Sequence, residues 1–212
     1  MYPYDNHEEA VLFMSIITIS REYGSGGHSI GQRVAQELGI EFYDKDIIRD
    51  TVRDSGLDSS VIEHEEEEIS RADAIWRWIT PAAYVDRREA IHEIERRVIL
   101  MLASKGPCVI LGRCADAILE DANIESLNVF IYADDIHRAV RVSELIGSKN
   151  PTDINRAMKH TDSARRAYYQ SFAGKHWGEA KNFSMSLDSG LLGYDACVKI
   201  ICEAARSLDE RK

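Results

Sequence analysis

Short apolar, β-branched runs alternate along this chain with longer stretches in which apolar positions recur every three or four residues. The apolar runs lie at residues 16–19, 40–43, 108–111, 127–132 and 183–188. The helical period is clear at Ile30, Val34, Ala35 and Leu38, and it returns at about 87–104 and 194–208. Runs of the first kind are typical of strands and the longer period of helices. The alternation predicts an α/β domain with a five-stranded, mainly parallel sheet and helices on both faces.

The stretch between the second and third apolar runs predicts helices, with breaks near Gly56 and Pro81. The acidic residues 63–68 are interpreted as a solvated helix face and not a metal site, because consecutive carboxylates point in different directions around a helix. Residues 1–14 are expected to be a flexible N-terminal segment, and 15–212 a single domain, since no linker or repeat divides them.

A glycine-rich turn joins the first predicted strand to the first predicted helix. Its residues are Gly24, Ser25, Gly26 and Gly27, followed by His28 and Ser29. Strand, glycine turn and helix in this order form an anion cradle, because backbone N–H groups and the helix N-terminus both favour negative charge. We therefore interpret Gly24 to Ser29 as a loop that binds the phosphates of a nucleotide. The alternative is a glycine-rich turn of another α/β fold.

This turn departs from the phosphate-loop pattern GxxxxGK[ST] at two positions. With Gly27 as the last glycine, Ser29 takes the place of the hydroxyl that binds magnesium. His28 then stands at the lysine position and Glu22 at the first glycine. A neutral imidazole is a poor replacement for an ammonium group. Either His28 is protonated, or Lys45, Lys159 or Lys175 substitutes, or any kinase activity is weak or absent.

Charged residues follow every predicted strand. In parallel sheets ligands bind beyond the carboxyl ends of the strands, so Arg21, Asp44 and Arg113 are candidate substrate-binding residues. Arginine offers a planar fork of donors that suits phosphate oxygens. Asp134-Asp135 and Asp188 follow the last two strands. The alternative is that these are ordinary loop charges.

Two later segments add further basic residues. Arg138 and Arg141 are spaced i,i+3 and can project toward one ligand. Residues 157–169 form a polar helix that gathers Lys159, Asp162, Arg165 and Arg166. Such a helix near a phosphate site can close as a lid over the transferring group, or it is a surface helix with internal ion pairs. Arg138, Arg141, Lys159 and Arg165 are the candidate catalytic residues.

Composition narrows the possible partners. The chain has 212 residues, 44% of them hydrophobic, and a net charge of −10, which argues against binding a long nucleic acid. Its four cysteines, at 108, 114, 197 and 202, lie in apolar segments without CxxC spacing and are interpreted as reduced core residues. No signal peptide or membrane-spanning run is apparent. We expect a cytoplasmic monomer or homodimer.

Several motifs together resemble the cytidylate kinase-like family of P-loop nucleoside monophosphate kinases, over roughly residues 15–205. These are ITISREYGSGG, FYDKDII, ILGRCADAIL, VFIYADDIHRAVR, KHTDSARRAYY and FAGKHWG with NFSMSLDSGLLG. The resemblance implies a three-layer P-loop fold with a helical monophosphate-binding insertion at about 45–104 and a lid at about 148–175. It also implies ATP as phosphoryl donor, Mg²⁺ bound with it, and a small phosphorylated acceptor.

The resemblance assigns roles residue by residue. It implies that Asp44 and Gly112-Arg113 lie at the site of the monophosphate nucleotide. Cys114 replaces the aspartate of the family's Gly-Arg-Asp segment. Arg138, Arg141 and Arg165 correspond to its catalytic arginines. CMP or dCMP is the acceptor it implies. A nucleotide-binding or sensing protein without activity, or a kinase for another small hydroxylated acceptor, are the alternatives.

Overall fold

The computed structural model describes residues 15–54 and 81–210. The predictions for residues 1–14, for Gly56 and for the acidic stretch 63–68 fall outside these ranges. The strands are β1 (Ile16–Arg21), β2 (Glu41–Tyr43), β3 (Cys108–Leu111), β4 (Ser126–Tyr132) and β5 (Met185–Asp188). They form one parallel sheet in the order β2-β3-β1-β4-β5, which confirms the predicted sheet and makes it entirely parallel.

The helices follow the predicted pattern with shifted ends. They are α1 (Gly27–Leu38), α2 (Lys45–Asp54), α5 (Pro81–Ser104), α6 (Ala115–Asp121), α7 (Asp135–Ile146), α8 (Pro151–Ala173), α9 (Ser189–Leu192) and α10 (Tyr194–Asp209), with a 3₁₀ turn at Ala180–Asn182. Helix α5 begins at Pro81, six residues before the predicted start at 87. The predicted break near Pro81 is the start of this helix, because proline lacks only an N–H that the first turn of a helix leaves free.

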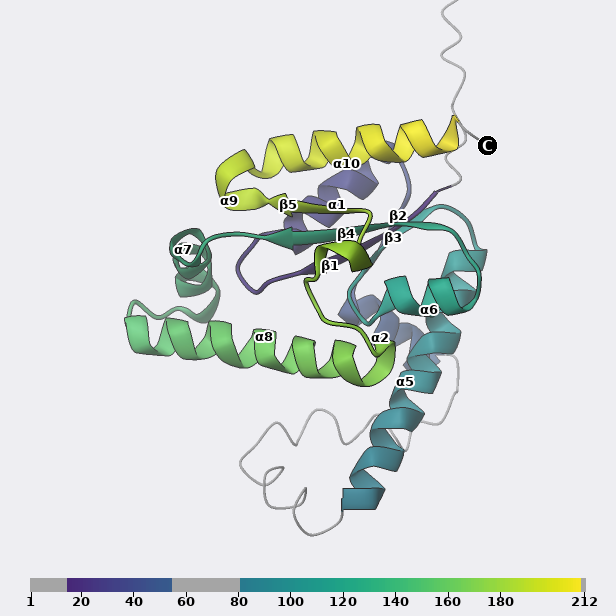
Figure 1. The fold of residues 1–212 in the computed structure, drawn as a ribbon, viewed down its shortest axis with the longest axis horizontal. Helices are drawn as coiled ribbons and strands as arrows, with labels where there is room; N and C mark the ends of the chain where they lie inside the picture. Colours follow the sequence, from purple (N-terminus) through teal and green to yellow (C-terminus); the bar gives the residue numbers. More distant parts are fainter. Residues whose placement is uncertain (1–14, 55–80, 211–212) are drawn as a thin grey trace, which may run out of the picture.

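Successive side chains of a strand point to opposite faces of the sheet, so the core has one layer on each face. Ile17 and Ile19 of β1 pack with Ile30 and Val34 of α1 and with Ile201 of α10. The other face of the sheet, with Ile16, Cys108 and Ile110, packs against α5 and α6. Figure 1 shows α10 above the sheet and α6, α8 and α5 below it. Helices therefore cover both faces of the sheet, which is the predicted three-layer arrangement. It also explains why most residues of the strands are apolar.

Helix α8 lies across the lower face and carries its own apolar contacts. Tyr169 packs with Phe130 and Phe183, while Ile154 and Met158 pack against Val142 of α7. Trp177, which follows α8, meets the ring of Phe130 edge-on at 5.2 Å and therefore belongs to this packing.

The four cysteines are buried and unpaired, as predicted. Among the described residues no helix combines the length and the apolarity needed to cross a membrane.

Candidate active site

The glycine turn leads from β1 directly into α1 at the carboxyl edge of the sheet. Gly26 adopts a left-handed conformation with φ 77° and caps α1, but it has no side chain that could accept from the first N–H groups of the helix. The Ser25 hydroxyl donates to the carbonyl oxygens of Glu22 at 2.9 Å and Ile131 at 3.1 Å. Ser189 Oγ donates to the Ser25 carbonyl at 2.7 Å. The turn is thus fixed from both sides, and its helix N-terminus can receive an anion.

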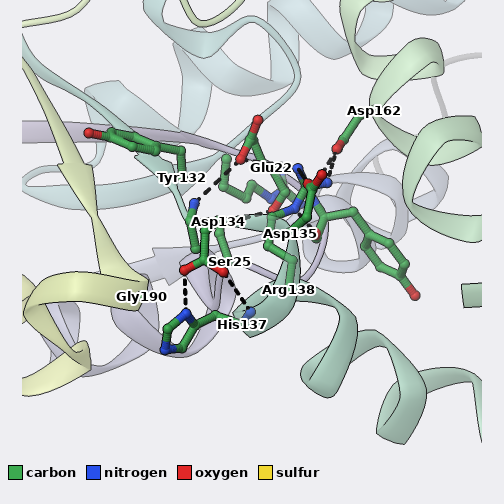
Figure 2. A network of polar contacts seen from close by, with 12 residues as sticks. Glu22, Ser25, Tyr132, Asp134, Asp135, His137, Arg138, Asp162 and Gly190 are labelled. Atoms are coloured by element: carbon green, nitrogen blue, oxygen red, sulfur yellow. Dashed lines mark hydrogen bonds and ion pairs between the residues drawn. The ribbon is translucent and has the colours of Figure 1, made fainter. Parts of the chain in front are cut away.

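Glu22, which replaces the first glycine of the consensus, belongs to a network centred on Arg138 (Figure 2). The buried Arg138 guanidinium donates from Nε to the Tyr23 carbonyl at 2.9 Å and pairs with Asp162 of α8. Its Nη1 lies 3.2 Å from Glu22 Oε2 and 3.6 Å from Asp135 Oδ1. Burial raises the pKa of Glu22, and the Arg138 charge opposes that shift. Arg138 therefore ties the turn to α7 and α8.

Arg141 lies on α7 one turn beyond Arg138 but has a different environment. Its Nη1 donates to Glu144 Oε2 at 2.9 Å in an i,i+3 pair on the helix surface. The Arg141 side chain is 42% exposed, whereas that of Arg138 is 8% exposed. The structure thus does not bring these two arginines together on one group.

His28, at the lysine position, contacts Asp44 at the end of β2. The distance from His28 Nε2 to Asp44 Oδ2 is 3.1 Å. Asp44 Oδ1 accepts from the backbone N–H groups of Asp46 and Ile47, both at 3.0 Å, and so caps α2. Burial raises the pKa of Asp44, but the hydrogen bonds from Ile47 and His28 outweigh it, so that the pKa is lowered.

Arg113 follows β3 in an unusual backbone conformation. Arg113 and Cys114 have φ values of 58° and 54°, in the left-handed region that costs most residues about 1–2 kcal/mol. This turn directs the guanidinium to Glu95 of α5, with which it forms an ion pair, and to the ring of Tyr168, 5.6 Å from its centroid. In the described part of the chain Arg113 Nε is buried and has no hydrogen-bond partner. Strain of this kind is often retained where it positions a functional group.

The pattern of the sequence gave no sign of Glu95, which is buried inside α5. The hydroxyl of Tyr168 on α8 donates to Glu95 Oε2 at 2.7 Å and lies 2.9 Å from His92 Nδ1. Burial lowers the pKa of His92, and the Arg113 charge acts in the same direction. Arg113 is thereby connected to both α5 and α8. A single acid in an amphipathic helix carries no signal in the sequence that would identify it.

Arg165 of α8 lies beside the glycine turn. Its Nη1 donates to the Arg21 carbonyl at 3.0 Å and lies 3.6 Å from Asp162 Oδ1, while its guanidinium is 5.7 Å from the centroid of the Tyr23 ring. The pKa of Arg21 is lowered to about 9, first by burial and then by the charges of Arg165 and Arg113, against which Asp44 and Asp162 act. Arg21 Nη1 lies against Gly112, the residue before Arg113, so three guanidinium groups meet from the end of β1, the turn after β3 and α8.

The predicted lysines are either exposed or paired with another side chain. Lys45 and Lys159 are exposed, and Lys175 forms an ion pair with Glu120 of α6. Ser29 lies in the first turn of α1 and is half-buried. Within the described ranges no group of three His, Cys, Asp or Glu side chains could hold a metal ion by itself. A cation here would need ligands from a bound nucleotide, as Mg²⁺ in nucleotide sites generally has.

Comparison with known proteins identifies the family. A model of the cytidylate kinase-like family matches residues 16–191, which confirms the resemblance found in the sequence. No curated protein matches the chain.

Three solved structures support the fold. An uncharacterized protein from Eubacterium ventriosum has a TM-score of 0.70 and 24% identity, over 92% of this chain and 99% of that one. A shikimate kinase from Bacteroides thetaiotaomicron has a TM-score of 0.54 and 14% identity, over 91% and 99%. A gluconokinase from Sinorhizobium meliloti has a TM-score of 0.51 and 19% identity, over 94% and 96%. At these identities the similarity shows a shared P-loop kinase fold and no more.

Proposed function

The chain belongs to the cytidylate kinase-like family, and from that premise we propose that it transfers a phosphoryl group from ATP to a small anionic acceptor. The observation that supports this is the gathering of three arginines at the carboxyl edge of the sheet: Arg165 donates to the Arg21 carbonyl, and Arg21 Nη1 lies against Gly112, next to Arg113. Three guanidinium groups of like charge repel one another, and a multiply charged anion between them would relieve that repulsion. A kinase that joins two phosphorylated substrates needs such a site.

In this proposal the turn from Gly24 to Ser29 binds the phosphates of ATP through backbone N–H groups. The acceptor oxygen forms a bond to the γ-phosphorus, the bond from that phosphorus to the bridging oxygen breaks, and ADP leaves with the electron pair. The acceptor's proton is released to solvent. The chemistry depends mainly on positioning and on neutralising charge.

The residues around the turn also fit a magnesium ion. We assign the Ser29 hydroxyl, in the first turn of α1, as its protein ligand, with the remaining ligands from phosphates and water. When bound, Mg²⁺ would neutralise charge on the phosphate oxygens. Ser29 would hold this ion beside the phosphates that the N–H groups at the N-terminus of α1 bind.

For the acceptor we propose a nucleoside monophosphate, with CMP or dCMP as first candidates from the family. Arg113 and Asp44, at the ends of β3 and β2, would bind it, and Arg165 would contact the transferring group. In this scheme the segment 45–104 is the acceptor-binding insertion and 148–175 the lid. Arg138 would act as a positioning residue for the loop, while Arg141 on α7 and Lys159 on α8 remain candidate catalytic residues. Four unpaired cysteines suit a reducing compartment such as the cytoplasm.

One observation favours a second candidate, a nucleotide-binding sensor without activity. His28 occupies the lysine position, and it contacts Asp44 at 3.1 Å. A histidine paired with a carboxylate supplies less positive charge to a phosphate than lysine does. A sensor would keep the loop and the arginines and bind nucleotide without turnover.

An assay of ADP release separates the two candidates. The purified chain is mixed with ATP, Mg²⁺ and one acceptor at a time, taken from CMP, dCMP and the other nucleoside monophosphates. Shikimate and gluconate, suggested by the names of two structural neighbours, form a second set of acceptors. Release of ADP that depends on CMP or dCMP supports the full proposal. Turnover only with the second set would reject the monophosphate, and ATP binding without any turnover would favour the sensor.

A further inference from the structure

The charge that a phosphate loop normally receives from its lysine needs another source in this chain, because His28 stands at the lysine position. His28 is exposed and contacts Asp44. Lys45 and Lys159 are exposed, and Lys175 is paired with Glu120. A further candidate is Arg21, the last residue of β1, three residues before Gly24.

The side chain of Arg21 runs along the floor of the loop. A Cβ atom added at Gly27 would lie 2.6 Å from Arg21 Cβ and 2.8 Å from its Cγ, so the aliphatic stem occupies the space above that glycine. A side chain added at Gly112, after β3, would overlap Arg21 Nη1. The absence of a side chain at Gly27 and at Gly112 thus leaves room for the Arg21 side chain, which extends from β1 toward the end of β3.

Of the three guanidinium groups in this cluster, that of Arg21 is the one that can bind a ligand without breaking an existing contact. Arg113 pairs with Glu95, and Arg165 donates to a carbonyl and lies near Asp162. Within residues 15–54 and 81–210, by contrast, the Arg21 guanidinium makes neither a hydrogen bond nor an ion pair. Arginine stays protonated in proteins, so its charge persists beside Arg113 and Arg165. A largely desolvated charge without a counter-ion is costly, so an anion bound to the Arg21 guanidinium would be stabilised.

We propose that Arg21 supplies the cation of this phosphate loop and contacts the phosphoryl group that ATP transfers. The inference rests on the proposed function and deepens it, because it moves the missing charge from the position after the last glycine to the position before the loop. A guanidinium can bind two oxygens of one phosphoryl group at once, which an ammonium cannot do in the same geometry. Arg21 then takes over the charge that His28 does not provide.

The test compares Arg21→Met with Arg21→Gln and Arg21→Lys, and with Arg33→Met as control. Arg33 lies on α1, is 45% exposed and is bound to Asp195 of α10 at 2.7 Å. With the acceptor that wild type uses, Arg21→Met should lower kcat by about 100-fold or more, the range for one group that stabilises a transition state. Arg21→Lys should recover part of that loss, and Arg33→Met should stay within about twofold of wild type.

Calorimetry provides a readout that needs no turnover. Wild type should bind ATP more tightly than AMP, and Arg21→Met should reduce that preference by about tenfold or more, the effect of one lost charged hydrogen bond. Arg21→Gln removes the charge but keeps a shorter polar side chain, and it replaces Arg21→Met if that variant does not fold. An unchanged preference in the uncharged variant, or unchanged kcat, would overturn the role of Arg21. If wild type shows no turnover but the preference is lost, the kinase proposal fails and the phosphate contact of Arg21 stands.

Discussion

The backbone N–H of Tyr23 donates to Asp162 Oδ1 at 2.8 Å, so that a residue of the glycine loop is bound directly to helix α8. The second carboxylate oxygen of Asp162 pairs with Arg138, which in turn donates to the Tyr23 carbonyl. Both polar groups of the Tyr23 backbone are therefore satisfied by one buried ion pair. Loop and candidate lid form one unit, and a movement of α8 would change the position of the loop.

The first prediction concerns this ion pair. Arg138→Ala should lower the free energy of unfolding by about 3–5 kcal/mol, because the buried carboxylate of Asp162 loses the cation that lies closest to it. Urea denaturation of wild type and variant measures the difference. Arg141→Ala, three residues further along α7, removes only an exposed pair with Glu144 and should cost less than about 1 kcal/mol. Equal losses in the two variants would contradict the central place of Arg138 in the network.

The second prediction is a pH dependence of stability. The pKa of Asp44 is lowered in the folded protein, so folding favours its ionised form. This contribution is complete above the pKa of an unfolded aspartate, about 3.9, and disappears as the pH falls through the lower folded value. The Tm of wild type should therefore fall more steeply below about pH 4 than the Tm of Asp44→Asn.

Thermal melts between neutral and strongly acidic pH provide the measurement. Asp46→Asn is the matched control, since Asp46 lies two residues away on the exposed side of the same turn. If the wild-type and Asp44→Asn curves run parallel over the whole acidic range, the hydrogen bonds to Asp44 contribute nothing to acid stability.

The strands and the loop could be predicted because their signals are local. The runs at Ile16 and Cys108 are mostly apolar and buried, which is typical of strands covered on both faces, and the glycines after β1 require a turn. The partners of the arginines could not be predicted in this way. Arg138 and Arg141 have the spacing that places side chains on one helix face, yet one is buried against Asp162 and the other pairs at the surface.

Glu22 illustrates why the departures from the consensus were hard to interpret. In the sequence it appears as the loss of a glycine, whereas in the structure its carboxylate meets an arginine 116 positions later in the chain, Arg138. Likewise Arg113 depends on Glu95, which comes from a different helix. Contacts between distant segments follow from the topology, and one sequence carries no direct record of them.

The third prediction separates binding from stability at Arg113. Arg113→Ala should weaken acceptor binding by about 1.5–3 kcal/mol, the range for a hydrogen bond to a charged group. It should also destabilise the fold, because the buried Glu95 loses its ion pair with Arg113. The double variant Arg113→Ala with Glu95→Gln removes that buried charge, and it should regain stability but not acceptor affinity.

Titration with the acceptor and urea denaturation measure the two effects independently. Arg156→Ala, an exposed arginine of α8 beside Asp153, is the control and should leave both unchanged. Acceptor affinity that returns in the double variant would mean that Arg113 acts only through the fold.

The last prediction concerns His28, which stands where a lysine is expected. If Arg21 provides the charge, His28→Ala should keep turnover within about threefold of wild type, less than 1 kcal/mol in the barrier. His28→Lys should be tolerated, because Asp44 lies 3.1 Å from the imidazole and would accept an ammonium group.

The pH profile decides between the two cations. An imidazole loses its charge as the pH rises through neutrality, whereas a guanidinium keeps it. Turnover that depends on Arg21 should therefore stay level between about pH 6 and 8 in both wild type and His28→Ala. Turnover that depends on a protonated His28 should fall across this interval, and His28→Lys should flatten the profile. A fall in wild type, together with a loss of about 100-fold in His28→Ala, would assign the charge to His28 and remove it from Arg21.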